Sequence, residues 1–137
     1  MLLTEIDQFH ELSYYTLEHP DREYFIHQHI VDAYTAQHAD SNTKPIAISF
    51  ALIGLYLFVE QGYTGKQVQL AHMEMAKHKR KWPLFELPIE RGNISVSEVL
   101  AASAGTERDE MIKAWCSEVW HSFQHYRDDV AALSSSH

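Results

Sequence analysis

Apolar residues along the chain recur three and four positions apart, which is the spacing of amphipathic helices. No stretch alternates strictly between apolar and polar residues, as a half-buried strand would. Start and stop signals predict four main helices, at residues 3–18, 21–39, 45–62 and 65–80. The pattern therefore indicates an all-helical protein.

Capping residues mark several of these boundaries. Thr64 and Gln67 have the spacing of a capping box, in which each side chain satisfies a free backbone N–H at the start of a helix. Ser95 and Glu98 repeat that spacing before a short helix. Pro45 stands in a first turn, where the missing N–H of proline costs nothing. Thr4 and Asp21 are the predicted caps of the first two helices.

The C-terminal third follows an irregular segment at residues 82–94, which contains two prolines and a glycine. Thr106 caps a predicted long final helix that ends near residue 133. Its apolar residues alternate four and three apart and form a heptad seam for packing on the bundle or on a partner chain: Ile112, Cys116, Val119, Phe123, Tyr126, Val130 and Leu133.

These elements predict one all-α domain over residues 1–137. We expect an antiparallel bundle of four main helices in residues 1–80, joined by the loop at 82–94 to a short helix and a long C-terminal helix in residues 95–133. The stretch 46–59 is apolar on every side, so other helices should surround it. As a helix it would span only ~21 Å, against roughly 30 Å of bilayer hydrocarbon.

Charge and composition narrow the function classes. The 137 residues carry a net charge of −8, which disfavours binding to the phosphate backbone of nucleic acids. Cys116 is the only cysteine, so neither an internal disulfide nor a cysteine-based zinc site is possible. The first residues lack the basic and apolar segments of a signal peptide. We therefore expect a cytoplasmic protein that binds neither nucleic acid nor membrane.

Ten histidines stand out in a chain of this length, and helical geometry sorts them by face. Because each residue turns a helix by ~100°, His10 and His72 fall on apolar stripes and His27 at the edge of one. In an up-and-down bundle His10 and His72 share a layer with Gly54, and His27 lies about one turn away. Glycine is unfavourable inside a helix, so Gly54 predicts room for a ligand, an ion or a close helix contact.

His10, His27 and His72 therefore predict a site for a divalent transition metal such as zinc, nickel or iron, with water completing the coordination. Four residues are candidate supporting ligands: Glu11, Tyr14, Asp32 and Tyr34. A metal-bound water would make the protein a metal-dependent enzyme acting on a small molecule. Each histidine alone is explained better by a buried ring bonded to a hydroxyl or carbonyl, whereas for the set of three the two interpretations are balanced.

His29 lies ~200° from His27 around their helix, so a regular helix cannot bring both to one site. It pairs better with Asp32, one turn later. Glu118, His121 and His125 also share one side of the final helix, but that side lies opposite the seam and is expected to face water.

Two other functions stay open at this stage. A non-catalytic interaction or ligand-binding module, dimerising through the final helix, fits the acidic composition and the seam equally well. A pH-responsive protein is the third alternative, because histidines titrate near neutrality.

Several strings of the sequence resemble a bacterial domain family of unknown function. They include His-Glu-Leu at residues 10–12, Phe-Ile-His-Gln-His-Ile-Val-Asp-Ala-Tyr at residues 25–34, and Trp-Pro at residues 82–83. The resemblance extends over about residues 9–100. It implies a helical, histidine-rich domain without assigning an activity or a functional residue. It also implies a Cys-x-x-Cys segment, which this sequence lacks.

Overall fold

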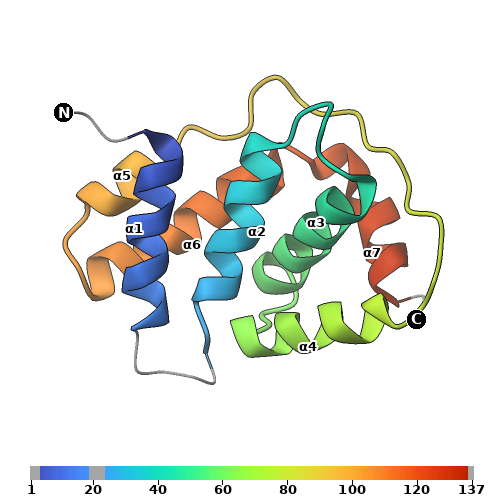
Figure 1. The fold of residues 1–137 in the computed structure, drawn as a ribbon, viewed down its shortest axis with the longest axis horizontal. Helices are drawn as coiled ribbons and strands as arrows, with labels where there is room; N and C mark the ends of the chain where they lie inside the picture. Colours follow the sequence, from blue (N-terminus) through green and yellow to red (C-terminus); the bar gives the residue numbers. More distant parts are fainter. Residues whose placement is uncertain (1–3, 19–23, 136–137) are drawn as a thin grey trace.

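The computed structural model describes residues 4–18 and 24–135, which form helices and no strand (Figure 1). The helices are α1 (Glu5–Leu17), α2 (His27–His38), α3 (Pro45–Val59), α4 (Gly65–Ala76), α5 (Val96–Ala101), α6 (Thr106–His121) and α7 (Arg127–Ser135), with a 3-10 turn, η1 (Gln124–Tyr126), before α7. The predicted all-α fold class is confirmed.

Helix α3 is the centre of the fold. It packs against α2, α4, α6 and α7, which lie around it in Figure 1. Every residue from Ala51 to Leu57 is buried, as expected for a helix that is apolar on all sides. The prediction that other helices surround residues 46–59 is therefore confirmed.

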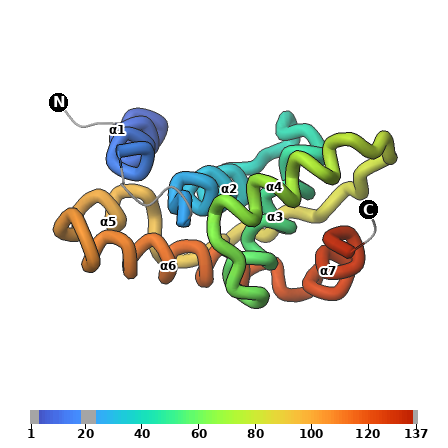
Figure 2. The backbone as a smooth tube through the Cα atoms, turned by 90° about the horizontal axis from the view of Figure 1, so that it is seen from below, coloured from blue at the N-terminus to red at the C-terminus, as the bar shows by residue number. Residues whose placement is uncertain are grey.

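Helix α1 lies at one end of the molecule, where it packs on α5 and α2 (Figure 2). Helix α4 crosses beneath α2 and α3 and has no comparable packing with α1. The helices follow one another along the chain as predicted, but the bundle is not built from the first four helices alone. In place of α4, the C-terminal helices α5 and α6 complete the bundle beside α1 and α2, so the predicted layer of His10, Gly54 and His72 does not form as expected.

Capping boxes are present at three helix starts: the two that were predicted, and a third at Thr4, which was predicted only as a cap. Thr4 pairs with Asp7, and the two later pairs, 64 with 67 and 95 with 98, form the same reciprocal bonds. The start of α2 was predicted wrongly. The helix begins at His27, after Phe25 adopts a left-handed conformation with φ of 47°. Asp21, its predicted cap, lies outside the described residues.

The loop between α4 and α5 is fastened to the C-terminal end of α2. The Arg91 Nη1 atom shares its two hydrogens among three carbonyl oxygens at the end of α2, which lie 2.7–3.1 Å away: those of Ala36, Gln37 and Ala39. The Gln37 amide donates to the carbonyls of Arg91 and Ile94, and its oxygen accepts from the Trp115 indole. These bonds satisfy carbonyls that a helix end leaves free.

The predicted final helix is broken into α6, η1 and α7, so its continuity was predicted wrongly. At the break the Ser122 hydroxyl bonds to the carbonyl of Val119, and the Phe123 amide donates to Trp120 in 3-10 fashion. Most seam residues are nevertheless buried within the chain, where α6 packs on α2 and α3 and α7 packs on α3. Of the two predicted packing partners of the seam, the bundle and a partner chain, the structure shows packing on the bundle.

Candidate functional site

The three histidines of the predicted metal site lie in different surroundings. His10 is exposed on α1, so its predicted inward orientation is wrong. The Nδ1 atom of half-buried His27 lies 2.9 Å from the Thr16 hydroxyl. Half-buried His72 stacks on Phe50 and places Nε2 2.8 Å from its carbonyl oxygen. Within residues 4–18 and 24–135, no three His, Cys, Asp or Glu side chains are grouped to hold a metal ion.

The four predicted supporting residues also separate. Glu11 and Tyr14 are exposed on α1. Tyr34 is half-buried, and its ring stacks on Phe9 with centroids 4.3 Å apart. Only Asp32 lies in the interior, where its side chain faces α3. The structure therefore does not bring the predicted ligands and supporting residues to one point.

A buried polar centre instead forms around His29 and Asp32 on α2. Their exposed fractions are 1% and 3%. The His29 ring stacks on Phe58 at a centroid distance of 3.6 Å, and neither ring nitrogen has a hydrogen-bond partner. Asp32 Oδ1 accepts from the Gln28 amide at 3.2 Å, whereas Oδ2 has no partner. Unpaired buried polar atoms are rare enough to need an explanation, such as an ordered water or ion.

Gly54 creates the space for this centre. A Cβ atom at position 54 would lie 1.9 Å from Asp32 Oδ2 and 3.2 Å from Val68 Cγ1. The prediction that Gly54 leaves room in the buried layer is confirmed, and the group that uses the room is the Asp32 carboxyl. The pairing of His29 with Asp32 follows from their spacing of one turn, whereas the burial of both residues was not predicted.

Burial favours the neutral form of each group in the centre. It lowers the pKa of His29 to about 3 and raises the pKa of Asp32 well above its usual value. Burial, reinforced by nearby Asp32, also raises the pKa of the Cys116 thiol. Cys116 Sγ donates to the carbonyl of His29 at 3.6 Å. The thiol is therefore a buried packing group and not an activated nucleophile.

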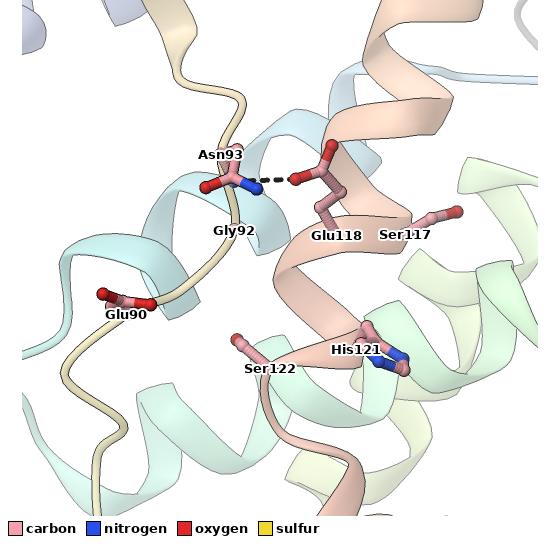
Figure 3. Close-up of a pocket in the computed structure, with 7 residues that line it drawn as sticks. All are labelled: Glu90, Gly92, Asn93, Ser117, Glu118, His121 and Ser122. Atoms are coloured by element: carbon pink, nitrogen blue, oxygen red, sulfur yellow. Dashed lines mark hydrogen bonds between the residues drawn. The ribbon is translucent and has the colours of Figure 1, made fainter.

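An open cleft of about 470 Å³ lies between the loop at residues 90–93 and the end of α6 (Figure 3). Glu118 points toward the loop and accepts from the Asn93 backbone amide at 2.7 Å. Ser117 and His121 point away from the loop, so the polar groups do not converge. The expectation that His121 and His125 face water is confirmed by their exposure, whereas Glu118 is half-buried and holds the loop.

The apolar stripe on which His10 falls was expected to face the core, but it lies on the exposed side of α1. We call Ile6, His10, Tyr14 and Leu17 the α1 stripe. Its three apolar members expose 46%, 71% and 59% of their surface, and a shallow pocket of about 400 Å³ lies over its C-terminal half. By helical geometry an exposed acidic row lies directly beside it: Asp7, Glu11 and Glu18.

Helix α1 has two apolar faces, and this explains the wrong assignment. Leu12 and Thr16 are its buried residues, with half-buried Phe9 and Tyr15 beside them. The stripe of residues 6, 10, 14 and 17 has the same helical spacing, so periodicity alone does not choose between the faces. The packing partners α2 and α5 make that choice.

Fold and surface together define a small all-α domain with a closed polar centre and exposed apolar residues along α1. The chain belongs to a family of unknown function (DUF5946), whose model matches residues 6–124. The expected membership in an uncharacterised domain family is thereby confirmed. No curated protein and no solved structure matches the chain. Over the described residues, no helix has the length and apolar character needed to cross a bilayer.

Proposed function

We propose that this protein is a non-catalytic interaction module whose α1 stripe binds an amphipathic helix carrying basic residues. The observation that carries the proposal is the exposure of Ile6, Tyr14 and Leu17 along one side of one helix. Grouped exposed apolar side chains are typical of binding surfaces, whereas isolated ones are ordinary. Amphipathic helices use such anchors, one or two turns apart, when they bind to a partner.

The charge beside the α1 stripe favours a basic partner. Asp7, Glu11 and Glu18 line one flank, and the whole chain carries 19 acidic against 11 basic residues. A partner helix with apolar residues on one side and Lys or Arg beside them would match both parts of this surface. Complementary charge of this kind raises association rates and discriminates against acidic partners.

An enzyme has less support from the geometry. The buried polar centre is closed, because His29 and Asp32 are almost fully buried. The open cleft beside α6 spreads its polar groups over different directions. A binding surface on α1 needs neither a catalytic constellation nor an entry path.

A designed helical peptide of Leu and Lys residues, arranged with the apolar residues on one face, tests the proposal. We expect saturable binding to the protein by fluorescence anisotropy and a loss of at least about tenfold in affinity for Leu17→Asp, because a charge replaces an apolar anchor. The matched control is Ile89→Asp, since Ile89 is fully exposed in the loop before α5. Equal binding to Leu17→Asp and to wild type would contradict the proposal, as would equal binding of a scrambled peptide.

A divalent transition metal is a second candidate ligand, at the buried polar centre. Its support is that both His29 nitrogens and Asp32 Oδ2 have no partner. Imidazole and carboxylate are common ligands of zinc, nickel and iron. Cys116 lies close by, although the described residues do not group three ligands for an ion.

Metal analysis of tag-free protein tests this second candidate. We expect stoichiometric metal in the wild type and its loss in His29→Gln and Asp32→Asn, but not in the exposed variant His10→Ala. Metal-free wild-type protein after incubation with zinc and nickel would contradict metal binding. Loss of metal in His10→Ala or His72→Ala instead would favour the histidine set predicted from sequence.

A further inference from the structure

The outer face of α4 carries a lysine at each end of an apolar pair, and the second of them, Lys77, is 3.1 Å from the carboxylate of Glu74 on the same helix. Lys66, Leu70, Met73 and Lys77 follow one another at spacings of four, three and four, so they lie on one side of the helix. All four are exposed, with Leu70 at 52% and Met73 at 57%. We call them the α4 stripe. The opposite side of α4 carries the buried Val68 and Met75.

Basic charge in this acidic chain is concentrated around the α4 stripe. Five of the 11 Lys and Arg residues lie between positions 66 and 81. Lys79 and Lys81 are exposed just beyond the end of α4 and extend the positive charge. The α1 stripe combines apolar residues with an acidic row, so the two exposed helix faces are complementary in both properties.

We infer that the α1 stripe of one copy of this protein binds the α4 stripe of a second copy. This inference rests on the proposed function and names its partner. The two helices match in length, since 13 residues of α1 and 12 of α4 span ~20 Å and ~18 Å. Side-by-side contact would bury Tyr14 and Leu17 against Leu70 and Met73, and bring the acidic row to the lysines.

Both stripes belong to every copy, but they are not packed together within one chain. Helix α1 lies at one end of the molecule, and α4 packs on α2 and α3 (Figure 2). The contact between copies is therefore heterologous, with a different surface on each side. Such contacts continue from copy to copy unless a ring closes.

The contact involves a single pair of helices, so its area is smaller than the roughly 1,200–2,000 Å² of stable interfaces. We therefore expect weak, concentration-dependent association. Opposite charge at the rim makes it sensitive to salt. Sedimentation velocity from micromolar to millimolar protein should show association at low salt that declines at high salt.

Two single-face variants give a decisive test. Leu17→Asp places a charge in the α1 stripe and should abolish its binding. Met73→Asp does the same in the α4 stripe. Each variant leaves the other stripe intact. Each variant alone should be monomeric where the wild type associates. An equimolar mixture should form a one-to-one dimer and nothing larger, because only one complementary pair of faces remains. Ile89→Asp, as the matched control, should associate like the wild type.

Circular dichroism and thermal unfolding of every variant establish that it is folded, which is expected because all three positions are exposed. A mixture that stays monomeric would overturn the inference, as would wild-type-like association of either variant alone. A wild type that is monomeric throughout, yet binds the Leu/Lys peptide through Leu17, would overturn self-association and leave the proposed function standing. Loss of peptide binding as well would overturn both.

Discussion

The carboxyl group of Asp32 occupies the space that any side chain at position 54 would need. A Cβ on Gly54 would lie 1.9 Å from Asp32 Oδ2, well inside contact distance. The contact joins α2 to α3 at a fully buried position. The glycine therefore serves the close approach of a polar side chain, and its cost in helix propensity is offset by that approach.

Gly54→Ala should destabilise the protein by about 1–3 kcal/mol, the range for overpacked cores. The added methyl group would force Asp32 out of its position. In an Asp32→Ala background the same substitution should cost much less, because the clashing carboxyl is gone. Urea unfolding of the two single variants and the double variant measures this coupling. Additive effects of the two substitutions would contradict the proposed contact.

Several helix starts and the buried central helix could be predicted from the sequence because their signals are local. Thr64 with Gln67 and Ser95 with Glu98 are complete capping motifs within four residues, and the structure contains both. The absence of a polar side along residues 46–59 was enough to predict that this helix is buried. The space at Gly54 was predicted too, but its occupant comes from another helix, and single-helix periodicity does not identify it.

Acid should destabilise the protein through His29. Burial lowers its pKa from 6.5 to about 3, so between these values the unfolded chain takes up a proton that the folded chain does not. The free energy of unfolding from this group therefore falls as pH falls, by about 1.4 kcal/mol per pH unit at most. His29→Gln should lose less stability than wild type between pH 6.5 and 4. Parallel stability curves from urea unfolding would contradict this.

Asp32 should have the opposite effect on the pH dependence of stability: its contribution to the free energy of unfolding increases as pH falls. Burial raises its pKa above 3.8, so above that pH the folded chain retains a proton that the unfolded chain has lost. Its contribution to the free energy of unfolding falls as pH rises. Asp32→Asn removes this opposing effect, and its stability should therefore fall more steeply than that of wild type as pH is lowered from 6.5. A shallower fall would contradict the assignment.

Arg91 should be a large single contributor to the docking of the loop before α5. Arg91→Ala leaves the carbonyls at the end of α2 without their donors, and we expect a loss of about 1–3 kcal/mol. Arg91→Lys should restore little, because one ammonium cannot reach the α2 carbonyls and also replace the Nε atom, which donates to the Pro88 carbonyl at 2.7 Å. Chemical denaturation measures both, with Lys79→Ala, an exposed basic residue, as the control. Full rescue by lysine would show that charge alone suffices.

Glu60 should control the attachment of α7. Its carboxylate accepts from the Trp120 indole at 2.7 Å and from Arg127 at 2.8 Å, so it connects the end of α3 to α6 and α7. Glu60→Ala should increase amide hydrogen exchange in residues 127–135 while α2 stays protected. The exposed variant Glu86→Ala is the control. Unchanged exchange in α7 would show that packing on α3 is sufficient.

The candidate surfaces were less predictable than the fold. His10 and Leu17 satisfied the same spacing rule as core residues, yet α1 buries its other apolar face against α2 and α5. His29 looked unsuited to the predicted site because it lies opposite His27, and that opposite side turned out to be the buried one. Helical geometry gives angles between residues on one helix, whereas the direction of the core depends on neighbours far away in the sequence.

Gly65 shows the same dependence within a motif that looks entirely local. It follows the cap residue Thr64, but its amide donates to the Tyr24 carbonyl at 2.6 Å, and a Cβ there would lie 1.7 Å from the Phe25 carbonyl oxygen. In an alignment of family members we therefore expect glycine at this column wherever the chain before α2 takes the same path. Members with a larger residue there should differ in the segment around position 25, so the two columns should vary together.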